Sequence, residues 1–314
     1  KDRLPTRADY DWQSPFHAGS SPRLVIPSTE EGTYYILFYG HDLPGGGTQG
    51  TARLEELDFA VTGTHTNRIG DLGTVTLGIR GSQFKEGAAV SLQQGGAELF
   101  ADEVEVVNST LLKATFSMGQ ASSREVETSE ETVTQTQTET VPLGQWTLRV
   151  TNPDGRAAVL PEPITVEPRL SPTLSMSVEI PPSIVTDQPT PGQLRIFNPA
   201  NVDVEKAFVW VKMPEAATME VKTLLVRLGV DEWDHDTFSW VSGGTRYVSI
   251  VIQNLPARTA KTLGISVAAQ EAGPYEFETD ALVLNDDEYV VALYLLLREY
   301  TSNAGIPLEF GDPT

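Results

Sequence analysis

The sequence predicts an all-β protein built from tandem β-sandwiches. Short runs of β-branched and aromatic residues recur along the chain, and turns of Gly, Pro, Asn and Asp separate them. The 26 glycines and 21 prolines are spread over all 314 residues and are not gathered in one linker. Because all-β modules hold about 100 residues each, this length allows three of them.

Acidic residues dominate the charge of the chain. There are 43 Asp and Glu against 22 Lys and Arg, which gives a net charge of −21. Such a surface repels phosphate backbones and anionic lipids, so we expect no nucleic-acid partner and no membrane insertion. The longest apolar run, residues 290–297, is shorter than the roughly 20 residues that span a bilayer. A start at Lys1 leads us to expect an excised or mature fragment.

The residues that usually carry catalysis are missing or scattered. Cysteine is absent, which excludes disulfides, thiolate zinc sites and a cysteine nucleophile. The four histidines, His17, His41, His65 and His235, form no HExxH or HxH pair. No Gly-x-Ser-x-Gly elbow, P-loop or dinucleotide fingerprint is present. We therefore predict no enzyme, and no catalytic, cofactor-binding or metal-ligating residues.

Two ligand classes stay open as alternatives. Calcium prefers six to eight oxygen ligands, and the densest acidic stretches are residues 231–236 and 286–288, neither of which has EF-hand spacing. Trp210, Trp233 and Trp240 raise the alternative of carbohydrate stacking. Trp210 alternates with apolar neighbours along a predicted strand, so we expect it in the core, whereas Trp233 lies in an acidic loop.

Residues 1–61 are predicted to be a β-rich module. Strands are expected at 23–27, at the aromatic run 34–39 and at 51–61, and the three consecutive glycines 45–47 indicate a loop. The segments 23–27 and 32–40 resemble the end of a bacterial pre-peptidase C-terminal domain, a secreted β-sandwich. The resemblance covers about half of that family's usual length.

Residues 62–167 show the clearest strand pattern. Residues 74–81 alternate with period two, and further strands are expected at 89–92, 104–107, 109–116, 144–151 and 157–166. Residues 152–155, Asn-Pro-Asp-Gly, predict a turn. The segments 74–84, 107–116, 144–155 and 164–168 resemble the IPT/TIG immunoglobulin-like domain. That resemblance implies a sandwich of about seven strands acting as a spacer, an adhesive unit or a ligand-contacting module.

A Thr- and Glu-rich insertion at residues 120–141 departs from the IPT/TIG pattern. Its acidic composition is typical of a disordered loop. The run 132–141, with Thr at every even position, is instead composed of strand-forming residues. A loop or hairpin without a partner and an edge strand that pairs with another chain both remain open.

Residues 168–284 are predicted to form a further sandwich. Pro168 and Pro172 stiffen the linker, so we expect a defined angle to the preceding module. Strands are expected at 174–180, 192–197, 207–213, 238–241, 247–253, 261–269 and 275–283. The segments 192–214, 252–267 and 272–283 resemble the adhesion-related CARDB sandwich, which implies an extracellular accessory domain without catalytic residues.

Residues 285–314 are expected to form a short helix and a tail. Asn285 or Asp286 provides an N-cap, and apolar residues follow up to Leu297, although a final strand also fits this composition.

Taken together, these patterns predict a non-catalytic extracellular module with a structural or adhesive role. It acts as a spacer or assembly segment of a larger bacterial surface or secreted protein, with copies of itself or other protein modules as partners. The alternative is a module of an exported enzyme or toxin that binds carbohydrate or protein. No cofactor is expected, with calcium as the remaining candidate.

Overall fold

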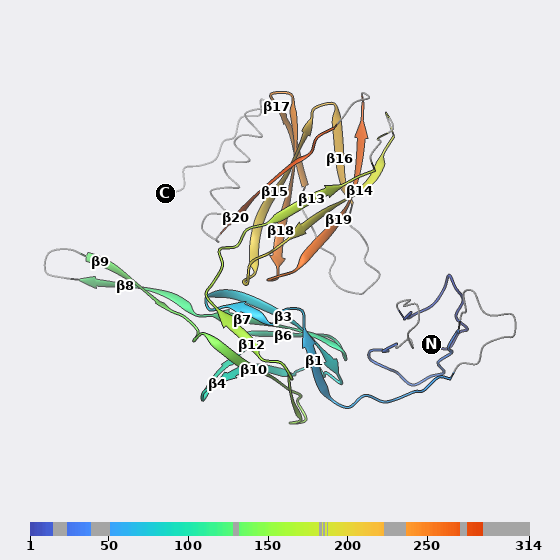
Figure 1. Cartoon of the computed structure of the whole chain (residues 1–314), viewed down its shortest axis with the longest axis vertical. Coiled ribbons are helices and arrows are strands. Elements are labelled where there is room, and N and C mark those ends of the chain that lie inside the picture. Colours follow the sequence, from blue (N-terminus) through green and yellow to red (C-terminus); the bar gives the residue numbers. More distant parts are fainter. Residues whose placement is uncertain are drawn as a thin grey trace, which may run out of the picture.

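The computed structural model describes residues 1–14, 24–38, 51–127, 132–181, 184, 186, 188–222, 237–270 and 275–284. Every regular element in these residues is a β-strand, so the prediction of an all-β chain of tandem sandwiches is confirmed. Figure 1 shows one sandwich above the other, with a long hairpin leaving the side of the lower one. The helix predicted at the C-terminus lies outside the described residues. No helix in the described part of the chain could cross a membrane.

The first sandwich spans residues 60–167 and holds two sheets. One sheet has the order β1-β3-β7-β6; the other has the order β2-β12-β10-β4-β5, with β11 paired to β10. Their bounds are β1 Ala60–Thr64, β2 Arg68–Gly70, β3 Gly73–Ser82, β4 Ala89–Gln94, β5 Ala97–Phe100, β6 Glu103–Asn108, β7 Leu111–Met118, β10 Gly144–Thr151, β11 Ala157–Val159 and β12 Ile164–Glu167. Neighbouring strands are antiparallel except β2 and β12, which are parallel.

The core of this sandwich follows from the alternation in its strands. Val75, Leu77 and Ile79 on β3 are fully buried, because the pleat sends every second side chain between the sheets. Trp146 on β10 reaches the same core, and its indole N–H donates to the carbonyl oxygen of Pro142 at 2.9 Å. Burial of this large side chain therefore leaves no unpaired donor.

The second sandwich spans residues 175–284. One sheet has the order β13-β14-β19-β16 and the other the order β17-β18-β15-β20. Their bounds are β13 Ser175–Glu179, β14 Thr190–Phe197, β15 Val204–Pro214, β16 Ala217–Lys222, β17 Thr237–Ser242, β18 Thr245–Leu255, β19 Ala260–Ala269 and β20 Glu278–Leu284. Val209, Val211 and Ile250 are fully buried between the sheets.

Most strands predicted after residue 60 are confirmed, with small shifts of their ends. The strand predicted at 157–166 is divided into β11 and β12, because Pro161 and Pro163 lie between them and lack the N–H that a ladder needs. β2, β5 and β16 were not predicted. They are short, or they contain Glu and Lys, which weakens the strand signal.

The strands predicted in residues 1–61 are wrong over the described residues. Residues 24–38 and 51–58 have no regular structure, and β1 begins only at Ala60. Ile36 and Phe38 are 63% and 67% exposed. Strand propensity alone cannot hold a strand whose backbone N–H and C=O groups lack a neighbouring ladder, and no described strand pairs with these segments.

The insertion forms a two-stranded ribbon, β8 Gln120–Glu127 and β9 Thr132–Glu139. Eight residues of each strand pair antiparallel, from Gln120↔Glu139 to Glu127↔Thr132. The hairpin alternative therefore holds over the described residues, and the disordered-loop alternative does not.

Candidate functional site: the junction of the two sandwiches

The two sandwiches meet through a loop of the second one, residues 198–203. Ala200 and Val202 in this loop are 2% and 1% exposed, and they belong to the buried cluster of the first sandwich. A Cβ on Gly70 would lie 2.5 Å from the Cγ1 of Val202. Only a residue without a side chain allows so close an approach, so Gly70 admits the loop to the edge of the first sandwich.

Backbone hydrogen bonds cross this junction. The N–H of Gly70 donates to the carbonyl oxygen of Asn201 at 2.8 Å, and the N–H of Asp203 donates to that of Thr74 at 2.9 Å. The donors and acceptors of these two bonds satisfy each other across the contact, so burial does not leave these backbone groups unpaired. The contact therefore resembles the interior of one domain more than a loose meeting of two.

Asn201 holds the linker between the sandwiches. It is fully buried, and its Oδ1 accepts from the N–H of Leu170 at 2.8 Å while its Nδ2 donates to the carbonyl oxygen of Pro168 at 3.0 Å. The N–H of Arg169 donates to the Oδ1 of Asp71 at 2.8 Å. The linker is thus held from both sandwiches, in addition to the stiffness predicted from its prolines.

Asn198 gives the docked loop its shape. Its buried Nδ2 donates to the carbonyl oxygens of Val202 and Leu255 at 2.9 and 3.1 Å, and its Oδ1 accepts from the N–H of Ala200 at 3.0 Å. Each of these bonds lies inside the second sandwich. The loop is therefore held in its shape by its own sandwich, apart from its contacts with the first.

A chain of hydrogen bonds links His65 of the first sandwich to Asp203 of the second. The Nδ1 of His65 accepts from the N–H of Gly78 at 2.9 Å, so the imidazole is the tautomer with its proton on Nε2. That Nε2–H donates to the carbonyl oxygen of Ala257 at 3.0 Å. The N–H of Ala257 in turn donates to the Oδ1 of Asp203 at 2.9 Å.

Burial changes the titration of both end groups. Desolvation lowers the pKa of His65, because the charged imidazolium is disfavoured away from water. Desolvation also raises the pKa of Asp203 to about 6, against hydrogen bonds from Thr76 and Ala257 that lower it. The acidic Glu205 nearby adds to the rise. Both groups are thus held towards their neutral forms.

Charged side chains surround the buried part of the junction. Glu167 pairs with Arg68 within the first sandwich, and its Oε1 lies 3.9 Å from an Nη2 of Arg258 in the second. The hydroxyl of Thr74 donates to the Oε1 of Glu205 at 2.6 Å. Exposed pairs of this kind contribute about 0–1 kcal/mol each, so the buried polar network matters more.

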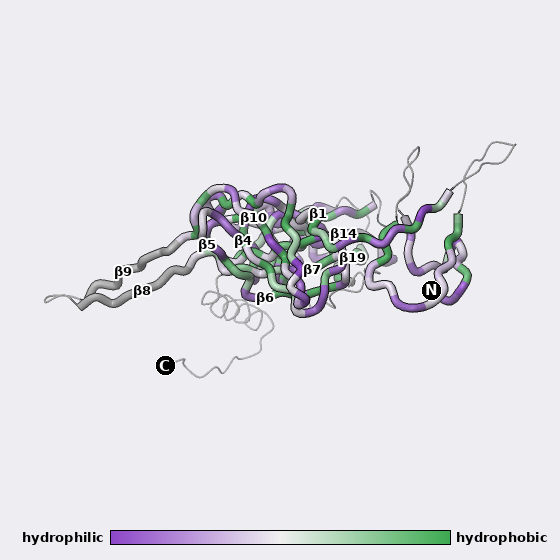
Figure 2. Tube along the Cα trace, turned by 90° about the horizontal axis from the view of Figure 1, so that it is seen from below, coloured by the Kyte–Doolittle hydropathy of each residue, from purple (hydrophilic) through white to green (hydrophobic). Residues whose placement is uncertain are grey.

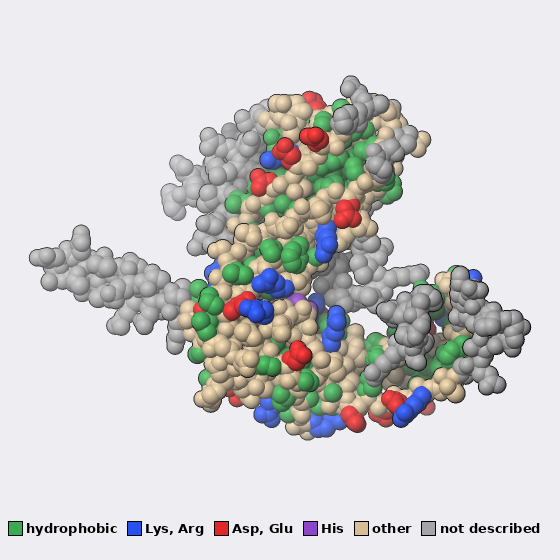
Figure 3. Space-filling view, in the orientation of Figure 1, with side chains coloured by type: hydrophobic (Ala, Val, Ile, Leu, Met, Phe, Trp, Pro, Cys, Tyr) green, Lys and Arg blue, Asp and Glu red, His purple; other side chains and the backbone are tan. Residues whose placement is uncertain are grey.

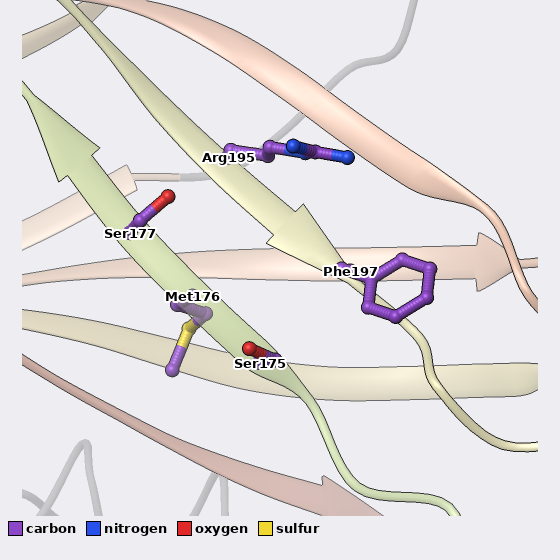
Figure 4. Close-up of a pocket in the computed structure, with 5 residues that line it drawn as sticks. All are labelled: Ser175, Met176, Ser177, Arg195 and Phe197. Carbon is purple, nitrogen blue, oxygen red and sulfur yellow. The ribbon is translucent and has the colours of Figure 1, made fainter.

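The junction positions polar groups without presenting them to a substrate. Every polar side chain described above is paired within the chain, and no nucleophile and base converge there. Outside the junction, a shallow cavity of about 200 Å³ lies against β13 and β14, lined by Ser175, Met176, Ser177, Arg195 and Phe197. Figure 4 shows these side chains spread along the two strands and not aimed at one point. We therefore take the junction as the candidate functional site.

Most of the other sequence candidates fall on residues that the structure does not describe. His17, His41, His235, Trp233 and both acidic stretches considered for calcium lie outside the described residues. Within the described part of the chain, no three His, Asp or Glu side chains are placed to hold a metal ion. Figure 3 shows charged side chains scattered over the visible face of both sandwiches.

Two aromatic pairs lie on the second sandwich. Trp210, predicted to be in the core, is only partly buried and lies on the other face of β15 from Val209 and Val211. Its ring stacks beside that of Phe208, with centroids 6.3 Å apart. The rings of Trp240 and Tyr247 are nearly parallel, at 5° and 5.1 Å. Phe208 and Trp210 both lie on β15, and Phe208 is buried, whereas Trp240 and Tyr247 face each other across β17 and β18 and supply a partly exposed aromatic surface.

The sequence reasoning missed the junction residues. Residues 198–201 read as an Asn-Pro turn, and that signal says nothing about burial against another module. Gly70 and the isolated His65 are the only local features of the sequence that could have indicated the junction, and neither residue type is specific for a contact between modules.

Comparisons with known proteins give no family. No family model matches the chain, and no curated protein matches it. Among solved structures, a match is found to BcpA, the major pilin subunit of Bacillus cereus, covering 72% of this chain and 67% of that chain. The sequence identity is 10% and the TM-score is 0.24. Similarity at this level assigns neither family nor activity.

Proposed function

We propose that residues 60–284 are a rigid, non-catalytic structural segment that holds two β-sandwiches at a fixed angle within a larger surface or secreted protein. The observation that carries the proposal is the junction, where the loop 198–203 completes the core of the first sandwich. A flexible pair of domains would meet through a more polar, separable surface. Here, separating the two sandwiches would expose Val202 to water and break the backbone hydrogen bonds that cross the junction.

The cost of bending follows from those contacts. Exposing a buried valine costs about 2 kcal/mol, and each lost backbone hydrogen bond costs about 1 kcal/mol net. If Asn201 stayed buried without the linker groups it binds, the penalty would be larger still. These terms favour one angle between the sandwiches over a range of angles.

The wider proposal joins this geometry to the sequence. We propose that the two sandwiches are IPT/TIG-like and CARDB-like modules, that the protein is extracellular, and that its partners are other protein modules or copies of itself. The net charge of −21 supports a solvated surface and disfavours nucleic acid. We propose no cofactor and no catalytic activity.

Small-angle scattering of residues 60–284 tests the rigid angle. The wild-type curve should fit one arrangement of the sandwiches. A double variant, Asn201→Ala with Val202→Ala, should broaden the distance distribution while circular dichroism shows both sandwiches folded. Thr147→Ala, an exposed change on β10, is the matched control. A wild-type curve that needs many inter-module angles would overturn the proposal.

Ligand binding is the second candidate function. It is favoured by the parallel rings of Trp240 and Tyr247, which are partly exposed and give a flat surface of the kind that sugars stack on. A glycan array probed with wild type and with Trp240→Ala tests it. Signals that the variant loses would support this role, and an array without signals would remove it.

A further inference from the structure

The β8–β9 ribbon has two open edges. Among the described strands, β8 pairs with β9 alone and β9 with β8 alone. Figure 1 shows the ribbon projecting well away from the sandwiches, whose strands in Figure 2 carry a mixture of hydrophobic and hydrophilic residues. A two-stranded hairpin is at best marginally stable alone in water, and three or more strands are needed for independent stability. A further strand paired to either edge would therefore stabilise the ribbon.

The base of the ribbon is anchored in the first sandwich. Gly119, with φ of 70°, turns the chain between β7 and β8 in a conformation that favours glycine. On the return side, the N–H of Val141 donates to the carbonyl oxygen of Asp71 at 3.0 Å. Both ends of the ribbon are therefore held, and the projection has a defined root.

The two edges differ in their sequences. β8 contains Arg124, Glu125 and Glu127, and natural edge strands use such charges to prevent pairing with other chains. In β9, residues 132–138 are Thr, Val, Thr, Gln, Thr, Gln and Thr, with no charge, proline or glycine. Uncharged segments of six or seven residues with high β-propensity are those that pair between chains. β9 is thus the unprotected edge.

We propose that β9 pairs antiparallel with β9 of a second copy of this chain, about a two-fold axis at Gln135, to form a four-stranded sheet. This inference rests on the structural role proposed above and names its partner. The register places Thr132 opposite Thr138 and Thr134 opposite Thr136. Threonine pairs across strands are favourable. In this register the uncharged residues 132–138 of one strand lie opposite residues 138–132 of the other, so no charged residue faces this segment.

The neutral sequence of β9 selects a second copy as the occupant. A basic partner would be drawn to the acidic surface and not to a neutral strand, whereas two identical Thr-rich strands match each other in this register. Because two chains with a net charge of −21 repel each other, the pairing must also keep their bodies apart. Eight residues of strand extend about 26 Å. Two ribbons overlapping antiparallel would hold the bodies about that far apart, well beyond the roughly 8 Å over which charges interact at physiological salt. Identical neutral strands can therefore pair without bringing the acidic bodies together.

Single-cysteine cross-linking of the full chain tests the register. The chain has no cysteine of its own, so each variant carries one thiol. Gln135→Cys should form a disulfide-linked dimer on oxidation, because it meets itself at the axis. Val133→Cys and Gln137→Cys should cross-link poorly alone and well when mixed. Thr147→Cys is exposed but lies on β10, which already has a neighbour on both sides, so its disulfide yield measures cross-linking by random collision. Equal yields at all positions would overturn the register.

Sedimentation at micromolar to millimolar concentration tests the pairing itself. Wild type should show a monomer–dimer equilibrium. Gln135→Lys should weaken the dimer at least about tenfold, or 1.4 kcal/mol, because it places two charges at the axis. Ser123→Lys, the matched change on β8, should leave it intact. A wild-type chain that stays monomeric, or a dimer that survives Gln135→Lys, refutes the proposal. The scattering test on residues 60–284 probes the inter-sandwich angle separately, so either idea can fail alone.

Discussion

Replacing Asp203 with Asn should change how the stability of the protein depends on pH. Burial raises the pKa of Asp203 from its ordinary 3.8 to about 6. Between these values the folded chain keeps a proton that the unfolded chain has released, so the free energy of unfolding falls as the pH rises through this window. The complete difference, reached above pH 6, is worth about 3 kcal/mol.

The Asp203→Asn variant has no charge to desolvate. Its amide oxygen can still accept from the N–H of Ala257, but its amide nitrogen cannot accept the hydrogen bonds of Thr76. We expect a net gain of about 1–3 kcal/mol in the free energy of unfolding at neutral pH. Near pH 4 that gain should vanish, since the wild-type carboxyl is then protonated in the folded chain.

Urea unfolding followed by circular dichroism at a series of pH values measures this difference. The lowered pKa of His65 also contributes to the pH dependence, but His65 is present in both chains, so the comparison isolates the change at Asp203. Asp154→Asn is the control. Lys85 and Arg156 lower the pKa of Asp154 to about 2, so its contribution is constant between pH 4 and 6 and is lost only as the pH falls further. If Asp203→Asn left the slope between pH 4 and 6 unchanged, the assigned burial of this carboxyl would be wrong.

Three further changes at the junction have expected outcomes. Asn201→Ala leaves the linker groups that Asn201 binds without partners, so it should lower the free energy of unfolding by about 2–3 kcal/mol, measured with urea; an unchanged midpoint would contradict its role. Gly70→Ala drives a Cβ into Val202 and should cost about 1–3 kcal/mol, with a broadened scattering profile, while Gly95→Ala, with open space around it, should not broaden that profile. His65→Ala should remove the contribution of His65 to the pH dependence, which lowers the stability as the pH falls below 6.5 and so opposes that of Asp203, because the lowered pKa makes the folded chain resist protonation; thermal melts of wild type and variant at several pH values should differ in slope below pH 6.5, and identical slopes would contradict this role.

The strands of both sandwiches could be predicted because their signal is local. Val75, Leu77 and Ile79 alternate with polar residues within one strand, and the same alternation decides which side chains are buried. The turn at residues 152–155 was equally readable, and the N–H of Gly155 donates to the carbonyl oxygen of Asn152 as such a turn requires. No distant residue is needed for these conclusions.

The same local signal failed where a strand lacks a neighbour. The aromatic run at 34–38 has higher strand propensity than β2, yet β2 forms and the aromatic run does not. β2 has β12 beside it in register, from Arg68↔Thr165 to Gly70↔Glu167. Pairing between residues about 100 positions apart is a property of the folded chain, and propensity does not encode it.

By itself, the sequence determined the all-β class, the positions of most strands, the charge of the surface and the absence of cysteine chemistry. Only the tertiary structure decided that the loop 198–203 completes a neighbouring core, that His65 and Asp203 are bridged through Ala257, and that the Thr-rich insertion is a projecting ribbon. The physical reason is range. Alternation and propensity act between adjacent residues, whereas burial, desolvation and ladder pairing depend on groups that the chain brings together from far apart.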